Sequence, residues 1–411
     1  MARKSLLSLL LIVSLVVSGQ EKYVGGDISM VPSYEKANVQ YFDRSGKRIS
    51  NLIEYFRDEA GFNIARVRLF VNPTKETGVV QDLDYVVGLS KRIKDAGLSL
   101  MLDFHYSDTW ADPKAQWIPA AWTSVADAAL PDTLYAYTKR VLERMTSAGA
   151  TPDFIQTGNE ISYGMLWGTN GTRTYYCHYD KDANWERLKK LLSEAGKACR
   201  EICPEAKIII HTERTNNLEG TKKIYNRLSS LDYDIIGLSY YPEWHDNISK
   251  LTSTLGNLHS LFPFKDIMLV ETGYYNNWYP ENATYNFTDK WPASPEGQKK
   301  FLDDLVKATE KMEYMKGILY WFPEENPSNN NRVYDPWYNH GLFNPNTGKV
   351  SEALFSLQAL RGITTGVEQL PGVESPLQTG SPIYTIDGRL VTSTDNLPCG
   401  IYIQNGKKIV R

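Results

Sequence analysis

The sequence predicts an α/β protein built on a (β/α)8 TIM barrel, with a short β appendage at its C-terminus. Its 411 residues suffice for one barrel, which needs roughly 250 residues or more, and for a small second module. Eight short apolar segments alternate with amphipathic segments of helical period, as eight βα units require. A doubly wound open sheet is the alternative fold, but the strand count and the lack of a Gly-rich phosphate turn argue against it.

The expected strands are nearly continuous runs of apolar, β-branched or aromatic residues. Such runs are typical of parallel strands that are buried on both faces. In chain order they cover residues 24–29, 64–70, 98–105, 154–159, 207–211, 235–240, 267–271 and 317–322.

The segments between these strands have the 3.6-residue period of helices. Val86, Leu89 and Ile93 fall on one helical face, and Gly97 marks the end of that helix. Ser294 precedes Pro-Glu-Gly, which is typical of a helix start, and this helix leads into the eighth strand.

The two ends of the chain differ from the barrel. A basic Arg3-Lys4 pair precedes an apolar run that is too short to span a membrane, so residues 1–19 are expected to be a signal peptide. The protein is then exported to the periplasm, the cell surface or the medium. An uncleaved anchor is the alternative.

The predicted barrel covers residues 20–362, and a linker rich in Gly, Pro, Thr and Ser covers 363–381. Residues 382–411 form a small β module. It contains two hairpin turns, at Asp387-Gly388 and Asn405-Gly406, and it resembles a sorting domain of exported bacterial proteins.

Composition restricts the class of ligand. The net charge of −3 gives no basic surface for nucleic acid. Ten Trp and 26 Tyr suit a surface that stacks on sugars, although large cores also contain aromatic residues. No Cys/His spacing fits zinc, so we expect no metal and no cofactor. The four cysteines are interpreted mainly as buried or free thiols, and the protein as a monomer.

Two glutamates end predicted strands. Glu160 follows the fourth strand and Glu271 ends the seventh, so both carboxyls face the barrel mouth, where active sites of this fold lie. Retaining glycosidases need such a pair, about 5–5.5 Å apart, with one acid and one ionised nucleophile. A single glutamate at a strand end is as readily an ion pair or a cap. Two of them favour a glycosidase.

The residues around this pair suggest supporting roles. Asn159 is placed to hydrogen-bond the sugar 2-hydroxyl, which leaves protonation of the leaving oxygen to Glu160 and nucleophilic attack to Glu271. Arg66 and Arg68 alternate onto one face of the second strand, and a cation there keeps the pKa of Glu271 low. The competing interpretation is a buried ion pair that only fills the barrel.

Further side chains end the other strands. Tyr240 is expected to hold the nucleophile carboxylate, and Trp321 to form the floor beneath the reacting sugar. His105 alone is more readily a core histidine, but its position at a strand end favours function. The remaining candidates for substrate binding or support are Asp27, Asp108 and Trp110.

Several motifs resemble glycoside hydrolase family 53, the endo-β-1,4-galactanases, over roughly residues 22–360. The most distinctive is Asp103-Phe104-His105-Tyr106-Ser107-Asp108-Thr109-Trp110-Ala111-Asp112-Pro113. The others are Arg66-Val67-Arg68, Gly158-Asn159-Glu160-Ile161, Ser239-Tyr240-Tyr241-Pro242, Val270-Glu271-Thr272 and Ser294-Pro295-Glu296-Gly297-Gln298.

The resemblance implies Glu160 as acid/base and Glu271 as nucleophile of a retaining double displacement. It implies a polysaccharide substrate, the β-1,4-galactan side chains of pectin known as type I arabinogalactan.

The chain departs from the family pattern at three places. Phe322 replaces the glutamate that usually follows the tryptophan of strand eight, so a charge there has gone or has moved to Glu324. Thr212-Glu213-Arg214 replaces an Asp-Asn pair after strand five. The loop 274–292 lacks the Asp-x-His-x-Asn run that binds calcium in some bacterial members, so structural calcium is not supported.

Two other functions remain open. A mannanase or cellulase of the same clan would use the same two carboxylates, although the loop 108–113 favours galactan. A non-catalytic glycan-binding protein on a barrel scaffold would have no need for both Glu160 and Glu271.

Overall fold

The computed structural model describes residues 22–362, except 77, 179–180, 328–332 and 334–338, and four short segments near the C-terminus, 383–385, 390–391, 401–404 and 407–410. The predicted signal peptide at 1–19 and the predicted linker at 363–381 lie outside the described residues. The chain divides into two compact units, residues 1–364 and 365–411.

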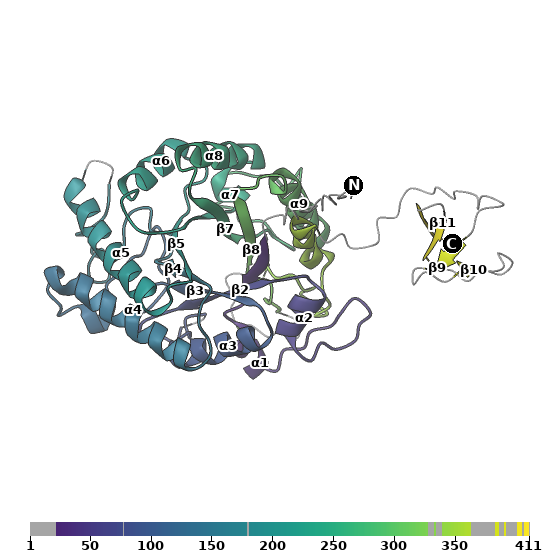
Figure 1. Cartoon of the computed structure of the whole chain (residues 1–411), viewed down its shortest axis with the longest axis horizontal. Coiled ribbons are helices and arrows are strands. Elements are labelled where there is room, and N and C mark those ends of the chain that lie inside the picture. Colours follow the sequence, from purple (N-terminus) through teal and green to yellow (C-terminus); the bar gives the residue numbers. More distant parts are fainter. Residues whose placement is uncertain are drawn as a thin grey trace, which may run out of the picture. The chain divides into compact units, whose positions relative to one another are not determined.

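The first unit is a (β/α)8 barrel, as predicted. Its eight parallel strands pair in sequence order and close between β1 and β8 (Figure 1). They are β1 (Tyr23–Asp27), β2 (Ile64–Leu69), β3 (Ser99–Phe104), β4 (Phe154–Thr157), β5 (Lys207–Thr212), β6 (Ile235–Tyr240), β7 (Asp266–Thr272) and β8 (Met315–Trp321).

Helices form an outer layer around the strands (Figure 1). Side chains cap several of them: Asp82 accepts a hydrogen bond from the Tyr85 amide, and Ser294 accepts one from Gly297. The helices are α1 (Val31–Lys36), α2 (Leu52–Asp58), α3 (Leu83–Asp95), α4 (Leu130–Ser147), α5 (Asp182–Ile202), α6 (Leu218–Arg227), α7 (Pro242–His245), α8 (Ile248–Leu261) and α9 (Pro295–Thr309), with short 3-10 helices at η1 (Ala120–Trp122), η2 (Asp127–Ala129) and η5 (Glu352–Arg361).

The barrel interior changes in character along the strands. Because successive residues of a strand point to opposite faces, Ile64, Arg66 and Arg68 of β2 all point inward. Ile64 belongs to a small apolar cluster inside the barrel, with Met101, Phe154, Ile209, Ile235, Met268, Val270 and Leu319. Arg66 and Arg68 come later on the strand, so the interior becomes charged toward the carboxyl ends.

The register between β6 and β7 determines which residues reach this charged end. Leu238 pairs with Leu269, but the next pair is Ser239 with Glu271, so Val270 is an extra residue on β7. Tyr240 then pairs with Thr272. Ser239 and Glu271 therefore share the inner face, and Tyr240 points outward.

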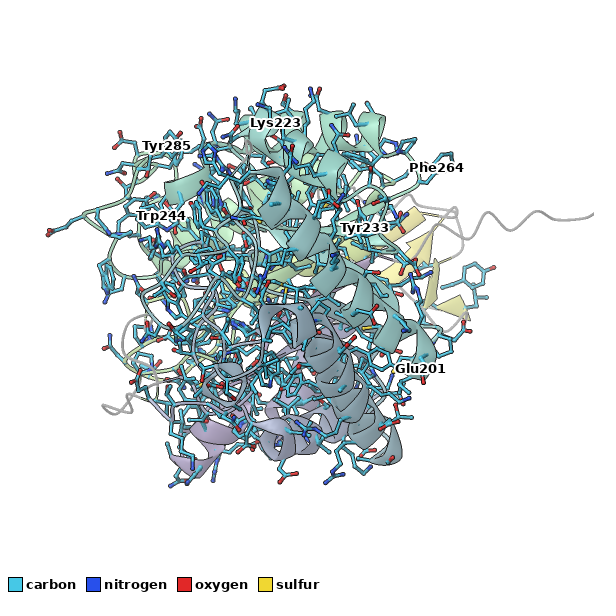
Figure 2. All side chains as sticks on the ribbon, turned by 90° about the vertical axis from the view of Figure 1, so that its left-hand side faces the viewer. Glu201, Lys223, Tyr233, Trp244, Phe264 and Tyr285 are labelled. Atoms are coloured by element: carbon cyan, nitrogen blue, oxygen red, sulfur yellow. The ribbon has the colours of Figure 1, made fainter. Side chains whose placement is uncertain are left out.

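The two ends of the barrel are seen from the side in Figure 2. Trp244 and Tyr285, which follow β6 and β7, are labelled at one end, and Tyr233 and Phe264, which precede these strands, at the other. No helix in the described part of the chain combines the length and apolarity that a membrane crossing needs. Cys177, Cys199 and Cys203 are buried free thiols, as expected, and Cys399 lies outside the described residues.

The second unit contains the predicted small antiparallel sheet. Its strands are β9 (Ile383–Thr385), β10 (Leu390–Val391), β11 (Ile401–Gln404) and β12 (Lys407–Val410), in the order β10-β9-β11-β12. The predicted turns at 387–388 and 405–406 lie outside the described residues.

Candidate active site

A pocket of about 720 Å³ opens where the loops after the barrel strands meet. Acidic and aromatic side chains from six strand ends line it, which is the composition of a site for a polar ligand with apolar faces. The lining includes His105, Trp110, Asp112, Asn159, Glu160, Glu213, Tyr241, Trp244, Glu271, Tyr275, Trp278, Glu281 and Trp321.

Glu271 lies at the carboxyl end of β7 and is 7% exposed. Its Oε1 atom is 2.8 Å from Nη2 of Arg66, and its Oε2 atom accepts a hydrogen bond of 3.3 Å from the Tyr241 hydroxyl. Burial raises the pKa of Glu271 above its ordinary value, and Arg66 opposes this rise. The predicted ion pair is confirmed. The predicted low pKa is wrong, because desolvation outweighs the cation.

Arg66 is completely buried and holds four groups in place. Besides Glu271, it contacts Asp27 at 3.1 Å, Asp103 at 2.8 Å and the Asn159 side-chain oxygen at 2.9 Å. Asp27 also binds Arg68 at 2.8 Å, so this aspartate fixes both arginines and does not face the pocket. The guanidinium fork thereby fixes the nucleophile candidate relative to Asn159.

Glu160 is held very differently. It follows β4 with a φ of 47°, an uncommon backbone conformation for a residue with a side chain. Its Oε1 atom accepts a hydrogen bond of 2.6 Å from Ser239, and its amide donates one of 3.3 Å to Nδ1 of His211. Burial away from water raises the pKa of Glu160 well above its ordinary value, and the negative charges of Glu271 and Glu213 raise it further. Glu160 therefore holds its proton more tightly than an ordinary glutamate does.

Asn159 links the two glutamates. Its side-chain nitrogen donates to the Ala111 carbonyl at 2.7 Å, while its oxygen accepts from Arg66 and, at 3.2 Å, from Gln156. These partners fix the orientation of the amide at the pocket wall.

Three further predicted residues come together beside the pair. Nδ1 of His105 accepts a hydrogen bond from the Ala111 amide, so the ring proton is on Nε2, which lies 3.0 Å from Asp103. The rings of Trp110 and Trp321 meet edge to face with centroids 6.1 Å apart, and Arg68 lies 4.7 Å from the Trp110 ring. Both tryptophans line the pocket.

Asp108 holds the loops together and is not among the residues that line the pocket. Its two carboxyl oxygens accept hydrogen bonds from the amides of Asn72 at 2.9 Å and Ala120 at 2.8 Å. This aspartate therefore organises the aromatic loop that carries Trp110.

The prediction for Tyr240 is wrong. Its side chain points away from the barrel interior, where its hydroxyl donates to the Asp246 carbonyl and its ring stacks on Phe301. The next residue, Tyr241, makes the contact with Glu271. Successive side chains of a strand point to opposite faces, so Tyr240 points outward because its neighbour Ser239 points inward.

Sequence reasoning also missed Ser239, the partner of Glu160, although it precedes Tyr240 in the same motif. Glu324 does not supply the charge that usually follows the tryptophan of strand eight in this family. Its side chain is buried and accepts a hydrogen bond from the Met30 amide. Within the described residues, no group of three or more His, Cys, Asp or Glu side chains is arranged to hold a metal ion.

Comparisons with known proteins agree on one family. The family model described as Glycosyl hydrolase family 53 matches residues 23–360. An "Arabinogalactan endo-beta-1,4-galactanase" of Thermothelomyces thermophilus is 34% identical over 316 residues, which cover 73% of this chain and 89% of that protein.

Two solved structures are also similar. The "Ignisphaera aggregans GH53 catalytic domain" is 28% identical with a TM-score of 0.73, and the match covers 83% of this chain and 96% of that one. A structure of "two fungal beta-1,4-galactanases" is 31% identical with a TM-score of 0.70, and the match covers 82% of this chain and 98% of that one.

Proposed function

The chain belongs to glycosyl hydrolase family 53 and is a glycoside hydrolase, and we propose that it cleaves β-1,4-galactan internally with retention of anomeric configuration. The observation that carries this proposal is the unequal environment of two carboxyls at one pocket. Glu271 is paired with a buried cation, whereas Glu160 has a hydroxyl partner and a strongly raised pKa.

This asymmetry supports a double displacement. Glu160 gives its proton to the glycosidic oxygen while Glu271 attacks the anomeric carbon, so the leaving sugar departs as an alcohol and a glycosyl ester forms on Glu271. Ionised Glu160 then takes a proton from water, whose oxygen attacks the anomeric carbon, so that the bond from this carbon to Glu271 breaks and the Glu271 carboxylate is released. Both groups end each cycle as they began.

The surroundings of the pair suit the reacting sugar. The Asn159 amide, held by Arg66 and Ala111, is available to the 2-hydroxyl, a contact that strengthens in the transition state. Trp321, packed against Trp110, offers an apolar face beneath the ring.

The substrate is proposed from the relatives. The named activity of the Thermothelomyces thermophilus relative and the fungal structures is β-1,4-galactan cleavage. We extend this to galactan side chains of pectin, met outside the cell after export through residues 1–19.

The test is incubation of the purified protein with linear β-1,4-galactan, β-mannan and soluble cellulose in parallel, with reducing ends and polymer length measured together. A rapid fall in galactan length with few new reducing ends is the expected result. Cleavage of mannan or cellulose instead would reassign the substrate. Binding of galactan without cleavage would contradict enzyme function.

A further inference from the structure

Glu213 is a buried carboxyl in the pocket that the proposed double displacement does not use. It follows β5, exposes 9% of its surface and lines the same pocket as Glu160 and Glu271. Its Oε2 atom accepts a hydrogen bond of 2.5 Å from Ser162, its one side-chain partner among the described residues. Burying a carboxyl is costly, so its place at a sugar-sized pocket needs an explanation.

Glu213 lies on the Glu160 side of the catalytic pair. The strands that carry the two residues are neighbours, and the Ile161 amide, directly after Glu160, donates to the His211 carbonyl of β5. The charge of Glu213 is one of the main charges that raise the pKa of Glu160. The main charges that act on the pKa of Glu271 are those of Arg66, Asp103 and Asp27. The acid protonates the oxygen that leaves with the departing sugar, so a group beside Glu160 faces that sugar.

Trp244 supplies an aromatic ring to the same pocket. It belongs to α7, which begins directly after β6, and Figure 2 shows it at the end of the barrel where the strands finish. The side-chain amide of Asn216, in the loop after β5, donates to the Trp244 carbonyl at 3.1 Å, so the loops that carry Glu213 and Trp244 are tied together.

We propose that Glu213 and Trp244 bind the sugar on the leaving-group side of the cleaved bond, a role that rests on the proposed function. Glu213 hydrogen-bonds the hydroxyls of that sugar, and the Trp244 ring stacks on its apolar face. A carboxyl with an aromatic ring matches both surfaces of a pyranose. Burial raises the pKa of Glu213 to about 7, so near neutral pH it both accepts and donates hydrogen bonds.

The experiment compares two substrates with different leaving groups. Galactotetraose places a sugar on the leaving side, whereas 2,4-dinitrophenyl β-galactobioside places an activated phenol there. Wild type, Glu213→Gln, Trp244→Ala and a control, Glu205→Gln, are assayed on both for kcat/KM. Glu205 is exposed on the surface, away from the pocket.

We expect Glu213→Gln and Trp244→Ala to lower kcat/KM for galactotetraose about 10- to 100-fold and to change that for the aryl substrate less than threefold. Retained aryl activity also shows that the variants fold. Equal losses on both substrates, or no loss on either, would overturn this inference. A wild type that cleaves no galacto-oligosaccharide would instead overturn the proposed function, and the inference with it.

Discussion

Nη2 of Arg66 lies 2.8 Å from Oε1 of Glu271, and the same nitrogen contacts Asp103 at 2.8 Å and Asn159 at 2.9 Å. This one guanidinium distinguishes two chemically identical carboxyls. Glu271 is next to the cation and ionises more readily, whereas Glu160 accepts a hydrogen bond from the Ser239 hydroxyl and has its pKa raised further above the ordinary value.

Replacing Arg66 with Lys tests this distinction. A lysine cannot contact all the acceptors of the guanidinium fork, so Glu271 loses part of its stabilising charge and its pKa rises further. The acidic limb of the kcat/KM profile should move to higher pH, and kcat should fall on the order of 10²-fold. Arg92→Lys, in an exposed pair with Glu35, is the control. An unchanged acidic limb would contradict the role of Arg66.

The neighbouring tyrosines give a matched pair of substitutions. Tyr241→Phe removes the hydrogen bond to Glu271 and should lower kcat about 10- to 100-fold with little change in melting temperature. Tyr240→Phe removes the hydrogen bond to the Asp246 carbonyl and should cost about 1 kcal/mol of stability while kcat stays near wild type. Kinetics and thermal melting of both variants decide, and the reverse pattern would refute this assignment.

Removing the acid/base should make activity dependent on an added nucleophile. Glu160→Ala should lose most activity on galactan and keep formation of the glycosyl ester on an activated aryl substrate, because the phenol leaves without protonation. Azide fits the space of the missing carboxyl and should restore turnover with a β-glycosyl azide as product. An α-azide would instead indicate inversion.

Glu243 predicts a pH dependence of stability. This carboxyl is buried, accepts a hydrogen bond of 2.5 Å from Tyr275, which lines the pocket, and has its pKa raised by burial from 4.5 to about 7. Between these two pH values the unfolded chain has lost the proton and the folded chain keeps it, so stability falls as pH rises. The loss is about 3 kcal/mol.

Glu243→Gln should remove this component. The difference in free energy of unfolding between variant and wild type, measured by urea titration at pH 4, 5.5 and 7.5, should shift in favour of the variant as pH rises. A constant difference across this range would show that Glu243 is ionised in the folded protein.

Much of the fold follows from the sequence, for a physical reason. Strands buried on both faces are apolar runs, and the charged residues that interrupt them, such as Arg66 and Asp103, mark the functional end of the interior. The positions of Glu160 and Glu271 at the carboxyl ends of β4 and β7 were therefore predictable.

The side-chain orientations at the strand ends were harder to predict from the sequence. Tyr240 and Tyr241 are adjacent and chemically alike. Which of them contacts Glu271 depends only on which one points to the same side of the strand as Ser239. The sign of the pKa shift of Glu271 depends on how completely its surroundings exclude water, which the sequence does not express. The role of Glu324 likewise depends on a long-range contact, the hydrogen bond that it accepts from the Met30 amide 294 residues away in the sequence.

Trapping the glycosyl-enzyme tests most directly whether Glu271 is the nucleophile. The wild-type protein is incubated with 2,4-dinitrophenyl 2-deoxy-2-fluoro-β-galactobioside, digested, and the labelled peptide sequenced by mass spectrometry. We expect one ester, on Glu271, and none in the Glu271→Gln variant. An ester on Glu160 or Glu213, or continued turnover of galactan with no trapped ester, would contradict the assignment of Glu271 as nucleophile.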